Sequence, residues 1–214
     1  MTQQVDTRTR ARDEFARLLA ERGYLGVSLE EVATLVEVKK ASLYHHFPGG
    51  KAALFAAVAH HYIRESGAGL RAALDSGDTV RDRLLALAGA YAQGAFDSVL
   101  GDRIYDATRH VDDATRAEIS HAYLQALVAP VTELMERAVE AGELRQADPG
   151  FLALAFMELA AVAQPLPPEV ALPPQERPAP TPRRQLAQDV VDLFLYGAAT
   201  DRRPTTSSPK RRKI

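Results

Sequence analysis

The chain has 214 residues, of which 46% are hydrophobic and 25% are charged, enough apolar content for the core of one or two domains. It contains no cysteine, which excludes a disulfide framework and thiolate chemistry. It also lacks any run of about 18 apolar residues and any apolar stretch within the N-terminal MTQQVDTRTRARDEF, so we expect a cytoplasmic protein with neither a membrane-spanning helix nor a signal peptide.

The first predicted elements are three short helices. Apolar residues at helical spacing predict a helix over 11–22, with Gly23 as its C-cap. Ser28 and Glu31 form a Ser-x-x-Glu capping box that opens a second helix. Its predicted buried stripe consists of Leu29, Val32, Ala33 and Val36. A third helix over 39–46 has about two turns and stops at FPGG, because proline cannot continue a helix.

The rest of the chain is also predicted to be helical. A long helix begins at Lys51 and continues to about Leu74, and Pro130 is expected to kink or divide a later one. The further predicted helices cover residues 80–99, 103–110, 114–141, 149–164 and 183–199. Between the last two, residues 165–182 hold 8 of the 13 prolines and predict an extended loop.

Neither internal repeats nor β-type alternation is apparent, so the predicted fold class is all-α. The predicted domains are residues 1–50, which hold the three short helices, residues 51–200, which hold the remaining helices, and a basic flexible tail over 201–214.

Three short helices before a long one are the layout of a helix-turn-helix domain, whose second motif helix lies in the DNA major groove. The two motif helices must pack closely, and small Ala33 with apolar Val38 and Leu43 meets that requirement. The outer face of the third helix then consists of Lys39, Lys40, Ser42, Tyr44, His45 and His46. These side chains offer hydrogen bonds to phosphates and base edges, and rings that pack on sugars or thymine methyls.

The stretch VSLEEVATLVEVKKASLYHHFPGGKAAL resembles the DNA-binding region of the tetracycline-repressor (TetR) family of transcriptional regulators. The resemblance covers about residues 11–54, and its most specific part is LYHHFPGGKAAL. It implies a repressor that binds double-stranded DNA, at a near-palindromic operator, as a homodimer and is released by an unidentified small-molecule effector. By the same resemblance, residues 1–50 are expected to be the helix-turn-helix DNA-binding domain and residues 51–200 the helical effector-binding and dimerisation domain.

By this resemblance, a set of polar residues is expected to contact DNA, with Lys51 gripping a phosphate. The set consists of Ser28, Lys39, Lys40, Ser42, Tyr44, His45, His46 and Lys51. Simpler interpretations stay open: Lys39 and Lys40 as an ordinary solvated pair, Tyr44 as packed against the long helix, and Lys51 as a plain helix-start residue.

The turn between the motif helices departs from the family pattern. Where the family usually has Ala-Gly-Val-Ser, this chain has Val36, Glu37, Val38 and Lys39. Glu37 either adopts the left-handed conformation that the glycine allows, at about 1 kcal/mol, or the chain uses another turn. The alternative function is therefore a helical small-molecule-binding or interaction protein with impaired DNA binding.

The last two helices are apolar over more than one face, and the resemblance implies that they pair with a second copy. The candidates for interface or core, not divided between the two, are Phe151, Leu154, Phe156, Val190, Phe194 and Tyr196. An effector cavity is expected among the middle helices, although each of its residues also suits the core. Its candidate residues are Tyr62, Tyr91, Phe96, Tyr105, His110, Tyr123 and Met157.

Catalytic and metal sites are not predicted. The adjacent histidines His60 and His61 point about 100° apart on a helix and cannot easily share one ion. Nucleophile triads, phosphate-binding glycine loops and paired carboxylates do not stand out, so neither an enzyme nor a cofactor is expected.

The tail is basic while the rest of the chain is acidic. Residues 202–214 hold 6 of the 26 basic residues and no acid, which leaves 20 basic against 28 acidic residues elsewhere. Any nucleic-acid binding by the body must therefore come from a local patch. The run Lys210–Lys213 has three interpretations: a nuclear-import signal in a eukaryotic host, an arm that neutralises DNA phosphates, or a solvated disordered end.

Overall fold

The computed structural model describes residues 6–164 and 181–196, and every regular element within these ranges is a helix, as the sequence predicted. The predicted proline-rich loop over 165–182 lies outside the described residues except for its last two positions. The basic tail over 201–214, and the end of the last predicted helix after residue 196, lie outside them as well.

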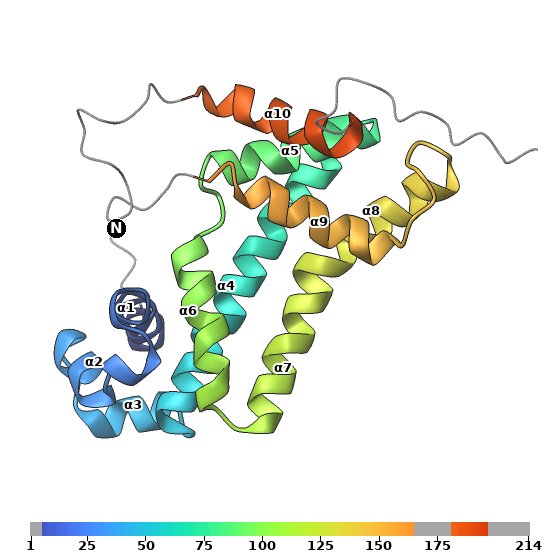
Figure 1. The fold of residues 1–214 in the computed structure, drawn as a ribbon. Helices are drawn as coiled ribbons and strands as arrows, with labels where there is room; N and C mark the ends of the chain where they lie inside the picture. The colour runs from blue at the N-terminus through green and yellow to red at the C-terminus, as the bar shows by residue number, and fades with distance from the viewer. Residues whose placement is uncertain (1–5, 165–180, 197–214) are drawn as a thin grey trace, which may run out of the picture.

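The N-terminal third contains the three predicted short helices and the long one (Figure 1). Their bounds are α1 Thr7–Arg22, the 3₁₀ turn η1 Tyr24–Gly26, α2 Leu29–Leu35, α3 Lys40–His46 and α4 Gly50–Asp75. Gly23 ends α1 with a positive φ of 71°, and its N–H donates to the Leu19 carbonyl. Lys39, predicted to lie in the third helix, is instead its N-cap.

The remaining helices form the other two thirds of the described chain. They are α5 Val80–Ala92, α6 Ser98–Ala107, η2 Thr108–His110, α7 Asp113–Tyr123, the π-helical turn η3 Leu124–Val128, α8 Ala129–Glu140, α9 Pro149–Ala161 and α10 Arg183–Tyr196. The predicted division near Pro130 is confirmed, because Pro130 stands in the first turn of α8.

The prediction of one helix over 80–99 is wrong. The chain leaves the helical path after Ala92, and Gly94 adopts a φ of 72°. A new helix begins at Ser98 because the Asp97 side chain accepts the Leu100 N–H at 2.9 Å. The helix predicted over 103–110 is therefore the second half of α6 followed by the turn η2.

Two apolar clusters make up the core, and α4 belongs to both. The N-terminal cluster joins α1, α2, α3 and the first half of α4, and it includes Ile104 and Ile119 from α6 and α7. The second cluster joins the end of α4, from Leu70 onward, to α5, α8, α9 and α10. Packing therefore continues across residue 50, and the predicted domain boundary there stays a prediction. Figure 1 shows α4 running from α3 at one end of the molecule to α5 at the other.

The turn from α2 to α3 uses the left-handed conformation at Glu37, whose φ is 58°. The Glu37 N–H donates to the Thr34 carbonyl at 3.1 Å, and the Val38 N–H donates to the Ala33 carbonyl at 2.9 Å. These two bonds define a Schellman motif, which a glycine normally completes. Of the two alternatives that the sequence left open, the chain adopts the strained one.

A side chain from α1 supports this turn. The Arg10 Nη2 donates to the Val36 carbonyl at 2.8 Å, at the end of α2. A terminal helix carbonyl thus has a charged partner, which satisfies a group that the helix itself leaves unpaired. The contact links α1 directly to the segment that sets the direction of α3.

The helix α4 approaches the π turn closely at one glycine. A Cβ added at Gly67 would lie 3.1 Å from both the Cβ and the carbonyl oxygen of Ala126, whereas one added at Gly69 would meet nothing within 4 Å. Gly67 thus allows the close packing of α4 on η3.

Replacing Glu37 by glycine is expected to raise the free energy of unfolding by about 0.5–1 kcal/mol, because a left-handed conformation costs an L-residue about 1–2 kcal/mol and glycine offsets only part of the gain through its unfolded-state entropy. Urea unfolding measures the change. The Glu37→Gln variant removes the charge but keeps the strain, and it should match the wild type. Destabilisation by Glu37→Gly would contradict the role assigned to the backbone here.

The Gly67→Leu variant is expected to lose about 1–3 kcal/mol of unfolding free energy, because the new side chain must push α4 away from η3. The matched Gly69→Leu variant adds the same group to open space on the same helix and should be neutral or stabilising, since leucine favours helix more than glycine does. Urea midpoints compare the two, and equal losses would show that the glycines act only through helix propensity.

Candidate DNA-binding site and ligand region

The helix α3 is held by two apolar anchors. Leu43 is fully buried and Phe47, its C-cap, is 3% exposed, both within the N-terminal cluster. The opposite face is open: Lys39, Lys40, Tyr44 and His45 are exposed, and Ser42 and His46 are partly exposed. The predicted polar face of α3 therefore points outward, away from the N-terminal cluster.

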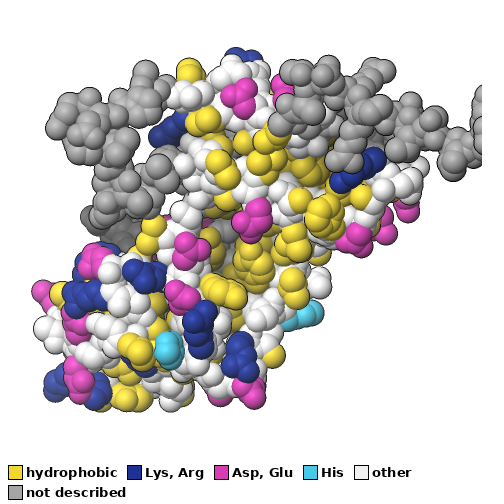
Figure 2. All heavy atoms as spheres, in the orientation of Figure 1, with side chains coloured by type: hydrophobic (Ala, Val, Ile, Leu, Met, Phe, Trp, Pro, Cys, Tyr) yellow, Lys and Arg dark blue, Asp and Glu magenta, His cyan; other side chains and the backbone are white. Residues whose placement is uncertain are grey.

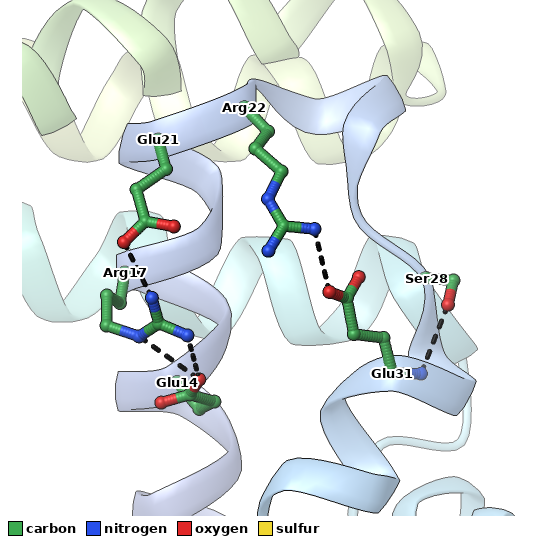
Figure 3. A network of polar contacts seen from close by, with 6 residues as sticks. All are labelled: Glu14, Arg17, Glu21, Arg22, Ser28 and Glu31. Atoms are coloured by element: carbon green, nitrogen blue, oxygen red, sulfur yellow. Dashed lines mark hydrogen bonds and ion pairs between the residues drawn. The ribbon is translucent and has the colours of Figure 1, made fainter.

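The N-terminus of α2 is capped by Ser28, whose hydroxyl accepts the Glu31 N–H at 3.1 Å (Figure 3). The predicted capping box is only half formed, because the Glu31 carboxylate turns instead to the Arg22 guanidinium of α1, at 2.7 Å. The same figure shows Arg17 bonded to both Glu14 and Glu21 along α1. Ser28 itself is exposed at the start of α2.

Lys40 has a partner within the protein. Its Nζ pairs with the Glu30 carboxylate of α2, and this hydrogen bond raises the pKa of Lys40. Any anionic partner of Lys40 would have to compete with Glu30 for the ammonium. Lys39 forms no ion pair with any residue that the structure describes.

Tyr44 is both exposed and packed, which agrees with the simpler interpretation of this residue, in which it packs against the long helix. Its side chain is 46% exposed, yet a Cβ added at Gly50 would lie 3.3 Å from its ring. Gly50 also has a φ of 64°, which favours glycine. Gly50, the second glycine of FPGG, therefore allows the turn and also leaves space for the Tyr44 ring.

Lys51 lies in the first turn of α4, with its Nζ 4.2 Å from the centre of the Tyr24 ring. Partial burial lowers the pKa of Lys51. The Tyr24 ring also meets Phe55 edge-on at 5.4 Å and stacks on His110 at 5.8 Å. His110, predicted to line an effector pocket, thus belongs to a contact between η2 and the N-terminal helices.

Two residues near this surface were missed by the sequence reasoning. The first is Tyr24, whose ring contacts both Lys51 and His110. The second is Arg8 of α1, whose guanidinium lies 5.6 Å from the centre of the Phe47 ring at the end of α3. Neither has a signal in its local sequence, because each acts through residues distant in the chain.

The seven predicted effector residues do not form one pocket. Tyr105 is 71% exposed and His110 stacks on Tyr24, so neither joins the others. The remaining five come from α4, α5, the loop before α6, α7 and α9: Tyr62, Tyr91, Phe96, Tyr123 and Met157. Tyr91 and Phe96 are in direct contact, with ring centres 4.5 Å apart.

Three of these tyrosines are close enough to influence one another. Burial raises the pKa of Tyr62 to about 12, and it also raises the pKa of Tyr91 and of Tyr123. Tyr62 and Tyr123 add to the effect at Tyr91, as does the Glu158 carboxylate of α9. All three hydroxyls therefore stay protonated and able to donate a hydrogen bond at neutral pH.

Two cavities open beside the loop that joins α5 to α6. The larger, of about 410 Å³, is lined by residues of α1, α4 and α6, with Tyr62 as its only predicted effector residue. The smaller, of about 300 Å³, is lined by Phe96 and four neighbours. Asp97 lines both cavities.

The helices α9 and α10 expose large apolar side chains. On α9, Phe151 is 59% and Leu154 52% exposed, and on α10 Tyr196 is 73% exposed. The other candidates are internal: Phe156 and Val190 are buried, and Phe194 packs edge-on against Phe156 at 5.0 Å. Figure 2 shows apolar side chains gathered over α9 and between α6 and α7.

The described residues contain neither a membrane-spanning helix nor a cluster of metal-ligating side chains. None of the helices there is long and apolar enough to cross a membrane. Within the same ranges, histidine, aspartate and glutamate side chains do not gather in threes as a metal site requires.

Comparison with known protein families matches two separate segments. The family of bacterial regulatory proteins called the tetR family matches residues 13–58. The C-terminal domain of AefR-like transcriptional repressors matches residues 103–198. The two segments together make up more than half of the chain.

Among curated proteins, the HTH-type transcriptional regulator BetI of Brucella anthropi is 37% identical over 75 residues. The match covers 35% of this chain and 38% of that protein. This similarity therefore concerns little more than a third of either protein.

Solved structures share the fold over most of the chain. AibR in complex with isovaleryl coenzyme A and operator DNA superposes with a TM-score of 0.70 at 22% identity, over 89% of this chain and 98% of AibR. FadR of Bacillus subtilis in complex with stearoyl-CoA gives 0.68 at 14% identity, over 89% and 99%. With its helix-turn-helix, its helical C-terminal part and these two family matches, the chain belongs to the tetR family of bacterial regulatory proteins.

Proposed function

We propose that this protein is a DNA-binding repressor that binds a near-palindromic operator as a homodimer and is released by a small-molecule effector. The observation that carries the proposal is the placement of α3, a two-turn helix anchored by Leu43 and Phe47 with its polar face exposed. Such a helix fits the DNA major groove.

The role proposed for each residue in DNA binding follows from its position on its helix. Ser42 and Tyr44 lie on the outer face of α3 and are proposed to reach base edges and the backbone, together with Lys39, Lys40, His45 and His46. Ser28 and Lys51 lie at the starts of α2 and α4 and are proposed to bind phosphates. Arg8, beside the end of α3, is a further phosphate candidate.

The turn at Glu37 favours this function over a protein with impaired DNA binding. The alternative was based on the absence of a glycine at position 37, which was expected to change the direction of α3. Glu37 adopts the conformation that the glycine usually provides, with both bonds of the Schellman motif in place.

A homodimer is proposed through α9 and α10. Phe151 and Leu154 are exposed on α9, Val162 is exposed at its C-cap, and Leu193 and Tyr196 are exposed on α10. Exposed apolar side chains clustered in this way mark an interaction surface. Two copies joined there would present two α3 helices to half-sites about 34–36 Å apart.

The effector is proposed to bind among α4, α5, α7 and α9, where Tyr62, Tyr91 and Tyr123 are close enough to influence one another and Met157 shares a core cluster with Tyr91. Apolar walls with a few hydroxyl donors are typical of small-molecule sites. AibR and FadR were solved with coenzyme A thioesters, and both share this fold. An effector that binds better to the conformation without DNA would release the operator.

DNA binding is tested with duplexes selected from a random pool and followed by fluorescence anisotropy across a salt series. Lys51→Ala should weaken the binding of selected and of random DNA by the same factor, because a phosphate contact carries no sequence information. It should also reduce the slope of log affinity against log salt concentration by about 1. Ser42→Ala should instead lose about 1–3 kcal/mol of discrimination at particular base pairs.

The control for these variants is Arg137→Ala, an exposed basic residue of α8, which should leave both quantities unchanged. Thermal unfolding of Lys51→Ala separates a loss of binding from a loss of the Tyr24 contact. If selection yields no sequence preferred over bulk DNA, the proposed function is wrong.

Leu154→Glu is expected to raise the dimer dissociation constant at least about tenfold, because the dimer would bury an unpaired carboxylate. Sedimentation velocity measures the shift toward monomer. Val99→Glu is the control, since Val99 is 42% exposed on α6 and Leu154 is 52% exposed on α9. A wild-type monomer, or equal effects of both variants, would rule out this interface.

A further inference from the structure

Two adjacent lysines at the start of α3 differ in whether they have a partner. Lys39, the N-cap, forms no ion pair with any described residue, whereas Lys40, the first residue of the helix, pairs with Glu30 of α2. Both lysines are exposed, and so is the Glu30 side chain, at 68%. The two lysines therefore start from the same surface with different charges around them.

Glu30 has one basic partner among the described residues. It is the second residue of α2, and its own carbonyl accepts the Thr34 hydroxyl at 2.9 Å. The neighbouring carboxylate, Glu31, is already bonded to Arg22, so the two acids of this turn have separate partners. A carboxylate in the first turn of a helix also interacts favourably with the helix dipole. The charge of Glu30 is thus balanced by Lys40 alone.

This pairing decides what Lys40 gains from a DNA phosphate. A lysine that neutralises a phosphate normally releases about one counterion from DNA. If Lys40 moved to a phosphate, the Glu30 carboxylate would lose its partner and take up a cation in exchange, so the net release would be close to zero. An exposed ion pair is weak by itself, so the effect comes from this exchange and not from the strength of the pair. Lys39 carries no such cost.

A base edge makes a different demand on Lys40. An ammonium group has three N–H donors, and Glu30 accepts one of them, so the others stay available. Guanine presents its N7 and O6 acceptors in the major groove without a net charge, so Lys40 can donate to them and keep its bond to Glu30. Building on the DNA-binding function proposed above, we propose that Glu30 is a specificity-determining residue, which leaves Lys39 to bind phosphate and reserves Lys40 for a base edge.

The first test measures binding of the full chain to a random-sequence duplex by fluorescence anisotropy, between about 50 and about 200 mM salt. The slope of log affinity against log salt concentration reports how many phosphates the protein neutralises. Lys39→Gln should reduce the slope by about 1 for each bound subunit, and Glu30→Gln should increase it by about 1, because Lys40 is then free to bind a phosphate. Replacing Glu30 and Lys40 together by glutamine should restore the wild-type slope.

Glu37→Gln is the matched control for Glu30→Gln. Glu37 is an exposed carboxylate of the same helix-turn-helix, two residues before Lys39, and none of the described lysines or arginines pairs with it. Its replacement removes the same charge without freeing a lysine, so the slope should stay at the wild-type value. An equal increase with Glu37→Gln, or no increase with Glu30→Gln, overturns the proposal. A slope that falls below wild type in the double variant also overturns it, because Lys40 would then already bind a phosphate.

The second test compares a duplex selected from a random pool with the random duplex. Glu30→Gln should lower the ratio of the two affinities at least about threefold, because random DNA gains a phosphate contact while selected DNA keeps Lys40 at a base. An unchanged ratio contradicts the reading of a base edge by Lys40. A wild type without any preferred sequence contradicts the proposed function itself, whereas a wild-type preference with the same salt slope in Glu30→Gln contradicts the role of Glu30 alone.

Discussion

The burial of Leu43 and Phe47 is the constraint on which the proposed DNA-binding surface depends. A helix of seven residues is too short to be stable alone in water, so α3 exists because these anchors fix it to the N-terminal cluster. The anchors also determine which side chains face outward. The left-handed residue Glu37 and the Arg10 contact then set the direction in which α3 leaves α2.

Several features of the fold were predictable because their signals are local. Gly23 as a helix end, Ser28 as a cap and Pro130 as a division each follow from the chemistry of one residue and its neighbours. The break after Ala92 was also readable, from Gly94 and from Asp97 three residues before Leu100, but the apolar periodicity across it suggested one continuous helix. Here a local cap outweighed the periodic pattern.

Other features required the fold. The pairing of Lys40 with Glu30, the stacking of His110 on Tyr24 and the turn of Glu31 toward Arg22 all join residues on different elements. A sequence shows that such groups are polar, but not which partner each one finds. This is why the outward direction of the polar face of α3 could be predicted, whereas the predicted effector residues separated: Tyr91, Phe96 and Met157 are buried in one cluster, and Tyr105 and His110 lie apart from it.

The membership of α4 in both core clusters has a mechanical consequence. A helix of 26 residues is about 39 Å long, and hydrogen bonds along its whole length make it a stiff rod. A tilt of about 10° pivoting at the Leu70 end would displace the Lys51 end by several ångströms, more than a phosphate contact tolerates. The tilt that α4 can make, and so the displacement of its Lys51 end, is thus limited by how tightly α4 packs at its other end, where Gly67 meets Ala126.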